Sequence, residues 1–421
     1  MKLWRMAGGL ASALTLVVLS PVSVGTAGAA EQVACGQAIT HSITLRTDIG
    51  PCTADGLRVV ASHITVDLNG HTVTGRNTRN TTEREQVGIN LMNVTGVTVT
   101  GPGTVQHFDA GVAVNGGSQN QIVNLTARDN VNHVVLTGAM NPCSYGDGIV
   151  TDNSTDNVIT GNVTSHNGPY DGIALVDASK GNRVSGNRSL DNDVSNILPN
   201  GQSGPCGPEG GGTASGRPHQ DMGIRVEGPG ATANVVSGNT TKGNQAAGIS
   251  IHGTQRSIEP PNTANLVLDN IVTGNGFAGP GDTFDGILSL PGYESSTILP
   301  AFGNTFARNV SSNNARSGIY AGGGKNTIVD NVVNDNVRDG IELFGPSVDA
   351  GVVYAGSVDN RVVSNTGHGN GVFDGEDHHP HCDHNEWIAN RFGTVNQPCV
   401  AAGGGTGTVP PGTPPVVEPT P

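Results

Sequence analysis

The sequence predicts an all-β solenoid, in which the chain winds into stacked coils of short parallel strands. Three observations lead to this fold class. The pattern Asn-x4-Asn occurs eight times, a Gly-Ile pair recurs at the start of apolar-alternating stretches, and the chain has 63 Gly residues but no long apolar stripe of helical period. The Asn pairs are Asn157/Asn162, Asn182/Asn187, Asn234/Asn239, Asn265/Asn270, Asn304/Asn309, Asn326/Asn331, Asn360/Asn365 and Asn385/Asn390.

The asparagines are expected at the corners of the coils. Asn tolerates the left-handed backbone region, and its side-chain amide both donates and accepts hydrogen bonds. Asn side chains of successive coils are therefore expected to form ladders, with a rung roughly every 4.8 Å, the spacing of neighbouring strands. In seven pairs a third Asn follows five residues later: Asn167, Asn192, Asn244, Asn275, Asn314, Asn336 and Asn370.

The spacing of the repeats predicts loops of unequal length. The first Asn residues of successive pairs are separated by 22 to 52 residues. The shortest separation fits one bare coil, so the additional residues of longer repeats belong to loops. Val, Ile, Thr and Leu occupy the stretches between the Asn residues, and these residues suit strands.

A Gly-Ile strand is expected to open each regular coil between Gly146 and about Asn396. Such a strand lies at the same place in every repeat, so its copies should stack into one sheet. The strands begin at Ile149, Ile173, Ile224, Ile249, Ile287, Ile319 and Ile341.

The first thirty residues have the pattern of a secretory signal peptide. Lys2 and Arg5 supply the positive start, Leu10–Leu19 the apolar stretch, and Ala27-Gly28-Ala29 the cleavage site. The apolar stretch is too short for a mature membrane span. The sequence therefore predicts a secreted, extracellular protein.

The rest of the chain divides into three parts. Residues 31–57 are expected to form an N-terminal cap, and residues 58–400 the stacked coils, with a strand at Asn132–Gly138. Residues 401–421 contain Gly, Pro and Thr with little apolar mass, which predicts a disordered tail.

The charge of the chain limits its partners. The formal net charge is −14, which repels nucleic acid and anionic membranes. It also disfavours polyuronate substrates unless calcium or local basic residues offset the field. We expect a monomer that binds neither nucleic acid nor membrane.

Six Cys residues in an exported chain predict disulfides. Fifteen pairings exist for six Cys. Pairs at the two ends would staple the end coils, and a pair between two loops would join neighbouring coils. The favoured pairs are Cys35–Cys52, Cys382–Cys399 and Cys143–Cys206.

Long insertions are expected to wall one face of the solenoid. Two precede a Gly-Ile strand, at Ser195–Gln220 and Gly276–Phe284, and three follow one, at Gly253–Ala264, Pro291–Phe302 and Gly345–Val358. The Gly-Ile sheet therefore has insertions at both edges. A sheet face between walls is a groove, and loops on a rigid scaffold commonly carry sites.

Side-chain alternation predicts which residues line this groove. If each Ile faces the core, the next residue and the one two further on face outward. The reactive side chains at these positions extend over five coils. At the strand spacing this is a span of roughly 20 Å, which suits about four sugar units. The reactive side chains at these positions are Arg225, Glu227, His252, Tyr320 and Glu342.

Arg225, His252 and Tyr320 are the residue types that a β-eliminating lyase or a C5-epimerase needs. A cation neutralises the uronate, a base takes the proton at C5, and an acid protonates the glycosidic oxygen. Glu342 is a further catalytic candidate, and Glu227 is a substrate-binding candidate. The alternative is ordinary polarity on an outward face.

An Asp precedes four of the Gly-Ile pairs, at Asp147, Asp171, Asp285 and Asp339. These residues either cap backbone N–H groups of a turn or form a carboxylate row at the groove rim. Asp285 and Asp339 flank one coil, so roughly 9–10 Å separates them, near the range of inverting glycosidases. Asp147 and Asp171 lie on adjacent coils, about 5 Å apart, as candidates to bind substrate or calcium.

The segment from Asp374 to His384 is dense in side chains that bind metals. Its His and carboxylate groups suit Zn or Cu, and the alternative is a polar end cap. Gly367-His368-Gly369 matches a tripeptide of polygalacturonases but falls on a corner-flanked side, which favours coincidence.

The Asn-x-Val-x-Gly-Asn coils with Asp-Gly-Ile strands resemble the right-handed parallel β-helix family, which includes pectate-lyase-like, NosD-like and sugar-hydrolase repeats. The segment from Cys35 through Cys52 to His71 looks like the cap and first coil of secreted actinobacterial members, and the segment from Cys382 to Cys399 looks like their end cap. The resemblance implies a right-handed, three-sided β-helix. The chain lacks the Asp-Pro-His-Glu motif of mannuronan epimerases and the full residue set of polygalacturonases.

Three functions agree with this sequence. The first is a secreted polysaccharide lyase or glycoside hydrolase acting in the walled groove. The second is a non-catalytic module that binds glycan or cell wall there, and the third is a NosD-like accessory protein that delivers metal. A pair of titratable groups within about 10 Å on the walled face, with shifted pKa values, would favour the enzyme.

Overall fold

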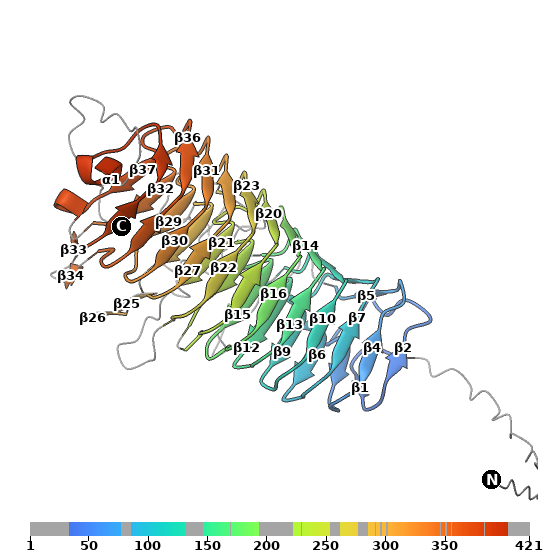
Figure 1. Cartoon of the computed structure of the whole chain (residues 1–421). Helices are drawn as coiled ribbons and strands as arrows, with labels where there is room; N and C mark the ends of the chain where they lie inside the picture. The colour runs from blue at the N-terminus through green and yellow to red at the C-terminus, as the bar shows by residue number, and fades with distance from the viewer. Residues whose placement is uncertain are drawn as a thin grey trace, which may run out of the picture. The chain divides into compact units, whose positions relative to one another are not determined.

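Three long parallel sheets run side by side along the described part of the chain (Figure 1). Each coil contributes one strand to each sheet, except that the first coil meets the third sheet only through an isolated bridge at Ile49, so the fold is a three-sided parallel β-helix, as predicted. The computed structural model describes residues 33–76, 86–131, 146–168, 170–192, 222–228, 230–252, 262–276, 285–290, 292–294, 297–299, 302–345, 347–349, 352–354, 356–382 and 384–402.

The first sheet contains all the predicted Gly-Ile strands, each of which begins at its Ile. Its strands, in stacking order, are β1 (Gln37–Ile39), β3 (Leu57–Val59), β6 (Val87–Met92), β9 (Ala110–Asn115), β12 (Ile149–Asp152), β15 (Ile173–Val176), β18 (Ile224–Val226), β21 (Ile249–His252), β24 (Ile287–Leu290), β29 (Ile319–Ala321), β32 (Ile341–Leu343) and β37 (Gly375–Asp377).

The second sheet follows the first of the paired Asn residues in each repeat. Its strands are β2 (Ile43–Thr44), β4 (Thr65–Asp67), β7 (Thr98–Thr100), β10 (Gln121–Val123), β13 (Val158–Thr160), β16 (Arg183–Ser185), β19 (Val235–Ser237), β22 (Leu266–Leu268), β27 (Thr305–Ala307), β30 (Thr327–Val329), β35 (Arg361–Val363) and β38 (Glu386–Ile388).

The third sheet follows the second of the paired Asn residues. Its strands are β5 (Thr72–Thr74), β8 (Thr104–Gln106), β11 (Thr126–Arg128), β14 (Val163–Ser165), β17 (Arg188–Leu190), β20 (Thr240–Lys242), β23 (Ile271–Thr273), β28 (Val310–Ser312), β31 (Val332–Asn334), β36 (Thr366–His368) and β39 (Arg391–Phe392).

A single apolar core fills the inside of the coils. In most coils of the second and third sheets, only the middle residue of the three-residue strand is fully buried, as in β13 and β14. The Ile residues that open the Gly-Ile strands belong to this same core. Stacked rows of Val, Ile and Leu thus replace the single packed centre of a globular domain.

Buried Asn ladders connect the coils, as predicted. Asn162 is fully buried and receives the backbone N–H of Leu125 at 2.9 Å. Its Nδ2 donates to Ile122 O at 2.9 Å and to Asn187 Oδ1 at 3.0 Å. Asn187 repeats these contacts with Asn239 one coil further on. Each ladder Asn thus satisfies backbone groups that the corner leaves without strand partners.

Of the two reasons given for Asn at the corners, the amide ladder is confirmed and the tolerance of the left-handed backbone region is wrong. None of the ladder Asn residues has a positive φ angle; the residue immediately before each does. Before Asn157, Asn162 and Asn167, for example, φ is 56° at Asp156, 68° at Gly161 and 55° at His166. Asn is therefore required because its amide points inward, and the residue before it adopts the left-handed conformation that turns the chain.

Disulfides close both ends of the stack. Cys35 bonds Cys52, and Cys382 bonds Cys399, which confirms two of the predicted pairs. The C-terminal bond joins a 3₁₀ turn (Pro380–Cys382) to the helix α1 (Pro398–Ala402). The predicted pair Cys143–Cys206 lies outside the described residues.

Several other predictions also fall outside the described residues. They are the signal peptide, residues 403–421 of the predicted tail, the strand at 132–138 and most of the five insertions. Ala401 and Ala402, predicted as the start of the disordered tail, instead belong to α1. Where the insertions are described, two form antiparallel hairpins, β25 (Gly292–Glu294) with β26 (Thr297–Leu299) and β33 (Ser347–Asp349) with β34 (Val352–Tyr354). In the described part of the chain, no helix has the length and apolar character that a membrane crossing requires.

Candidate functional site

One column of side chains follows the outer face of the first sheet. The strand register aligns the residue after each Ile with its counterpart in the next coil. This outer column consists of Val150, Ala174, Arg225, Ser250, Leu288, Tyr320, Glu342 and Glu376. Alternation thus predicted correctly that Arg225, Tyr320 and Glu342 share one face.

The outer column is buried, contrary to the expectation of an open groove at these positions. Arg225 and Tyr320 are each 5% exposed, and Glu342 is 0% exposed. Apolar neighbours pack over parts of the column, and Leu288 and Tyr320 lie in a cluster separate from the main core. Alternation decides on which side of a sheet a residue lies, but packing on that side decides whether water reaches it.

The four Asp residues before Gly-Ile strands bind backbone N–H groups of the next coil. Oδ1 of Asp147 accepts from Asp171 N at 3.0 Å, and Oδ1 of Asp171 accepts from Met222 N at 3.2 Å. Asp285 accepts from Ser317 N at 2.9 Å. Asp339 accepts from Phe373 N at 2.8 Å. These carboxylates therefore cap backbone groups, the first of the two alternatives.

Arg225 is the centre of a middle cluster on β15, β18 and β21. Its Nε lies 2.6 Å from Asp171 Oδ2, its Nη1 donates to Glu227, and its guanidinium lies 5.4 Å from the centre of the Tyr170 ring. His252 follows in the next coil beside Glu227. The middle cluster consists of Asp147, Tyr170, Asp171, Arg225, Glu227 and His252.

The ion pair between Arg225 and Asp171 argues against a calcium-binding site formed by Asp147 and Asp171. Arg225 already supplies a cation to this carboxylate, and one oxygen of Asp147 is held by a backbone N–H. Calcium prefers six to eight oxygen ligands. The two carboxylates and their described neighbours do not supply such a set.

Burial controls the protonation of the middle cluster. It raises the pKa of Asp147 to about 6 and that of Asp171 well above the usual range, although Arg225 opposes both shifts. Burial lowers the pKa of His252 to about 4, against the effect of Glu227. Burial also acts to raise the pKa of Glu227, but Arg225 outweighs it and the pKa is lowered. Near neutral pH, His252 is therefore an uncharged imidazole beside an ionised Glu227.

His252 also has an unused ring nitrogen. Its Nε2 is buried and has no hydrogen-bond partner among the described residues. The side chain as a whole is half-buried, and that of Glu227 is 25% exposed. Buried polar atoms without a partner are uncommon and call for an explanation, such as a catalytic role.

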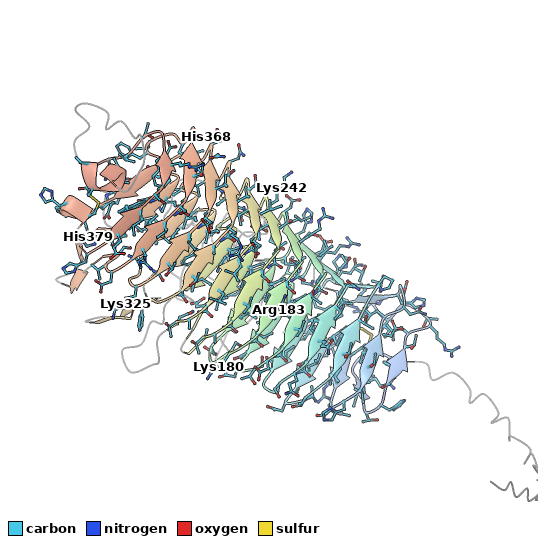
Figure 2. All side chains as sticks on the ribbon, viewed as in Figure 1. Lys180, Arg183, Lys242, Lys325, His368 and His379 are labelled. Atoms are coloured by element: carbon cyan, nitrogen blue, oxygen red, sulfur yellow. A yellow bond between two sulfur atoms is a disulfide. The ribbon has the colours of Figure 1, made fainter. Side chains whose placement is uncertain are left out.

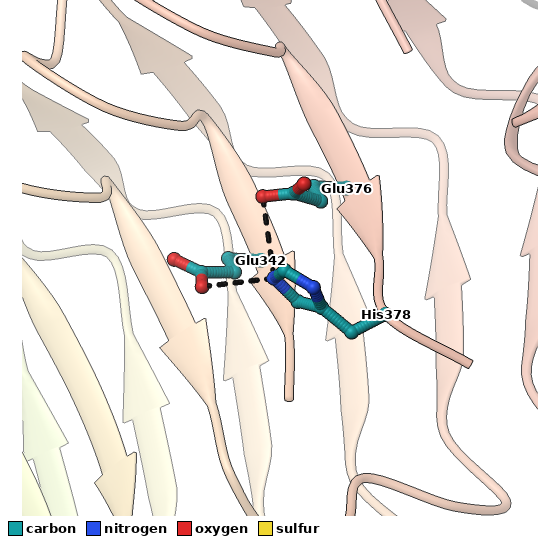
Figure 3. Close-up of side chains that lie close together, drawn as sticks. All are labelled: Glu342, Glu376 and His378. Carbon is teal, nitrogen blue, oxygen red and sulfur yellow. Dashed lines mark hydrogen bonds and ion pairs between the residues drawn. The ribbon is translucent and has the colours of Figure 1, made fainter. Parts of the chain in front are cut away.

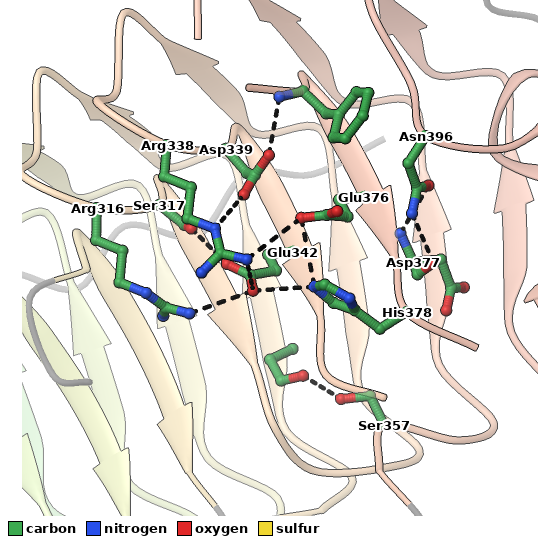
Figure 4. A network of polar contacts seen from close by, with 12 residues as sticks. Arg316, Ser317, Arg338, Asp339, Glu342, Ser357, Glu376, Asp377, His378 and Asn396 are labelled. Atoms are coloured by element: carbon green, nitrogen blue, oxygen red, sulfur yellow. Dashed lines mark hydrogen bonds and ion pairs between the residues drawn. The ribbon is translucent and has the colours of Figure 1, made fainter. Parts of the chain in front are cut away.

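A second, C-terminal cluster surrounds Glu342 (Figure 4). Oε1 of Glu342 receives Arg316 Nη2 at 3.2 Å and lies 3.3 Å from Arg338 Nη2. Its Oε2 accepts from the Ser317 hydroxyl at 2.6 Å. The C-terminal cluster consists of Asp285, Arg316, Ser317, Arg338, Asp339, Glu342, Glu376 and His378.

His378 links two carboxylates of the C-terminal cluster (Figure 3). Its Nε2 lies 3.2 Å from Glu342 Oε1 and 3.3 Å from Glu376 Oε2. Burial acts to lower the pKa of His378, but the neighbouring carboxylates of Glu342 and Glu376 raise it to about 10. Burial acts to raise the pKa of Glu342, but Arg316 and His378 lower it to about 2. Glu342 and His378 therefore form an ion pair at neutral pH.

The two Asp residues considered as an inverting pair belong to this cluster. Burial raises the pKa of Asp285 to about 6 against Arg316, and burial together with Glu376 and Glu342 raises that of Asp339 to about 9. Arg316 binds Asp285 at 3.0 Å, and Arg338 binds Asp339 at 3.0 Å. Neither Asp side chain is exposed to water.

The structure does not bring Tyr320 to Arg225 and His252. Tyr320 lies on β29, three strands beyond Arg225 on β18. Its ring lies 4.5 Å from the Arg316 guanidinium and 6.1 Å from the Phe344 ring. Tyr170 takes its place beside Arg225.

Sequence reasoning missed Tyr170, Arg316 and Arg338 as members of these clusters. All three occupy the same repeat position, three residues before the Ile of a Gly-Ile strand. That shared position was a usable signal. Glu376 was seen only as part of the dense segment, because Gly375 stands where the other strands have Ile.

Most of the segment 374–384 serves the end of the stack. Asp377 accepts from Trp387 Nε1 at 2.9 Å, and His381 and His384 are exposed. Among the described residues of this segment, only Glu376 and His378 join Glu342 in a group that meets the distance requirement for holding a metal. His368 of the Gly-His-Gly tripeptide lies exposed on β36 of the third sheet, away from both clusters (Figure 2).

Comparison with known proteins agrees with the fold. Residues 49–202, less than half of the chain, match the family model described as periplasmic copper-binding protein (NosD). No curated protein matches the chain. The arrangement of three parallel sheets defines a three-sided parallel β-helix protein.

Similar solved structures include three carbohydrate enzymes. Pectate lyase Pel9A has 14% identity and a TM-score of 0.49 over 79% of this chain and 72% of its own. A mutant of the periplasmic alginate epimerase AlgG has 14% identity and a TM-score of 0.47 over 77% of this chain. The Azotobacter vinelandii mannuronan C-5 epimerase AlgE6 A-module has 15% identity and a TM-score of 0.45 over 86% of this chain and 82% of its own. The chain spans 64% of the AlgG structure.

Proposed function

We propose that this chain is a secreted polysaccharide lyase in which His252 acts as the general base on a uronate-containing glycan. The observation that carries the proposal is the half-buried, uncharged imidazole of His252, whose Nε2 has no partner among the described residues. A neutral imidazole with an unpartnered nitrogen is in the protonation state that a general base requires.

The neighbours of His252 support proton abstraction. Arg225 holds Glu227 beside His252 and keeps it ionised, and this negative charge stabilises the imidazolium that forms when His252 takes the proton from C5. His252 takes the C5 proton, a C4=C5 double bond forms, and the C4–O bond breaks. The leaving oxygen takes its proton from water.

Lyase chemistry is preferred here to hydrolysis because of solvent access. A glycoside hydrolase requires two carboxyl groups that reach the glycosidic bond or its attacking water. Asp285, Asp339 and Glu342 have no exposed side-chain surface, and each is held by an arginine. Tyr170, Glu227 and His252 are the partly exposed titratable groups of the middle cluster, although Nε2 of His252 is itself buried.

A binding module would need a different surface. Such modules present exposed aromatic platforms to sugars. On the outer face of the first sheet, the aromatic residues whose side chains are described are Tyr170, Tyr320 and Phe344, all buried or half-buried. The two observed disulfides favour an oxidising, extracellular or periplasmic compartment, which agrees with export.

A panel of uronate polysaccharides tests this function. The full chain is incubated with each polymer, and unsaturated products are followed by their ultraviolet absorbance. His252→Ala is expected to lower the rate by about 100-fold or more, the usual contribution of a general base. The matched control is His368→Ala, an exposed His on the third sheet, which should retain full activity. Absence of product on every polymer, or equal rates for both variants, would refute the proposal.

A further inference from the structure

We propose that Glu342, Glu376 and His378 bind a divalent transition-metal ion such as Zn²⁺ or Mn²⁺ at the C-terminal end of the first sheet. This site is separate from the middle cluster, and the proposal does not rest on the proposed lyase activity. It uses different residues and a different kind of ligand.

The backbone brings the three ligands together. Glu342 on β32 and Glu376 on β37 are register partners in neighbouring strands, so their side chains project side by side from the outer face. His378 follows Glu376 by two residues and turns back toward both carboxylates (Figure 3). The three candidate ligand atoms all lie within 4.8 Å of one another.

The distances between these atoms suit one shared ion. Nε2 of His378 lies 3.2 Å from Glu342 Oε1 and 3.3 Å from Glu376 Oε2. Ligands at about 2.0–2.1 Å from a metal lie roughly 3.0 Å apart in an octahedron and roughly 3.4 Å apart in a tetrahedron. Both observed distances fall between these values. The two carboxylate oxygens lie within 4.8 Å of each other and would take up the same spacing around a shared ion.

Glu376 provides independent support for a missing ligand. The residue is 3% exposed, and its Oε2 has no hydrogen-bond partner within the described part of the chain. This oxygen faces His378 Nε2 at 3.3 Å and Arg338 Nη2 at 3.8 Å, contacts without hydrogen-bond geometry. A buried carboxylate oxygen in this state gains most from a directly bound cation.

Neighbouring residues orient the Glu342 carboxylate and also compete with a metal ion for it. The Ser317 hydroxyl holds the second oxygen of Glu342 at 2.6 Å, the kind of supporting contact that fixes a metal ligand. Arg316 Nη2 lies 3.2 Å and Arg338 Nη2 3.3 Å from the first oxygen, and both compete with a bound ion for it. Two carboxylates and one imidazole suit Zn²⁺ or Mn²⁺ better than Ca²⁺, which prefers oxygen ligands alone.

Calorimetric titration of the chelator-treated full chain with ZnCl₂ alone and MnCl₂ alone tests the site. We expect one equivalent of at least one ion to bind, with affinity lowered about 10-fold or more by Glu376→Gln and by His378→Gln. Arg338→Gln is expected to raise the affinity, because it removes a competing cation. His368→Gln is the control and should leave binding unchanged. No binding of either ion, or binding that none of the three variants alters, would overturn the proposal.

X-ray absorption of the zinc-loaded wild-type protein gives a second test that does not depend on variant folding. The expected first shell contains oxygen and nitrogen at about 2.0 Å, with a single imidazole. A shell with two or more imidazoles would place the metal on other His residues and would also overturn the proposal.

Discussion

Removing one amide from an Asn ladder is expected to destabilise the solenoid strongly. Asn239 is 1% exposed, and its Oδ1 receives the backbone N–H and the Nδ2 of Asn187, at 2.9 and 3.0 Å. Its own Nδ2 donates to Val184 O and to Asn270 Oδ1, each at 3.0 Å. Asn239→Ala therefore removes four buried hydrogen bonds in one step.

The size of the effect follows from the groups left behind. Two buried donors of Asn187 lose their acceptor, and each unsatisfied buried donor costs about 1–3 kcal/mol. We expect Asn239→Ala to lower the free energy of unfolding by about 4 kcal/mol. Asn239→Asp keeps the acceptor oxygen but loses the donor and buries a charge beside carbonyl oxygens, so it should destabilise at least as much.

Urea unfolding followed by far-ultraviolet circular dichroism, with the disulfides intact, measures this effect. The matched control is Asn334→Ala, a half-buried outward Asn on β31 that accepts one bond from His368 N at 3.1 Å. We expect this control to cost about 1 kcal/mol or less. If Asn239→Ala were no more destabilising than Asn334→Ala, the ladder would not stabilise the stack and the reasoning would be refuted.

Three further predictions concern pH, the end cap and the C-terminal cluster. Burial lowers the pKa of His252 to about 4, below its unfolded value of about 6.5, so folding favours the neutral ring. The contribution of His252 to the free energy of unfolding should therefore be fully present above pH 6.5 and be lost as the pH falls from about 6.5 to 4. The loss over this range should be smaller in His252→Gln. Parallel pH profiles of the urea midpoint for both proteins would contradict this. Replacing both Cys382 and Cys399 by Ser should lower stability by about 3 kcal/mol, since the bond closes a loop with a sequence separation of 17; an unchanged urea midpoint would count against it. Glu342→Gln should lower stability by about 3 kcal/mol by leaving buried cations around a neutral amide, and a thermal midpoint equal to that of the wild type would show that these ion pairs do not matter.

Local repetition made the fold accessible from the sequence. The Asn spacing and the Gly-Ile pairs recur at the same place in each coil, so strand order, register and the inward Ile residues such as Ile224 followed from the repeat alone. The left-handed conformation was expected at each ladder Asn, but the residue before the Asn adopts it. The inward amide and the left-handed turn are both properties of Asn, and spacing alone does not separate them.

The site was less accessible because it depends on packing outside the repeat. Alternation placed Arg225 and Glu342 on the outer face, but it carried no information on burial or on which charges meet. Long side chains such as Arg316 and Arg338 reach across coils from positions before the strands, so they join clusters that strand positions do not predict. Tyr320 was grouped with Arg225 and His252 although strand order already separates it from Arg225 by three strands.

The most direct test of the functional account is a crystal structure of the protein with a bound uronate oligosaccharide. The account predicts a sugar on the outer face of the first sheet, with C5 of one residue within about 3.5 Å of His252 Nε2, the separation of a near-attack geometry. A sugar bound only on the second or third sheet, or only at the C-terminal cluster, would contradict it.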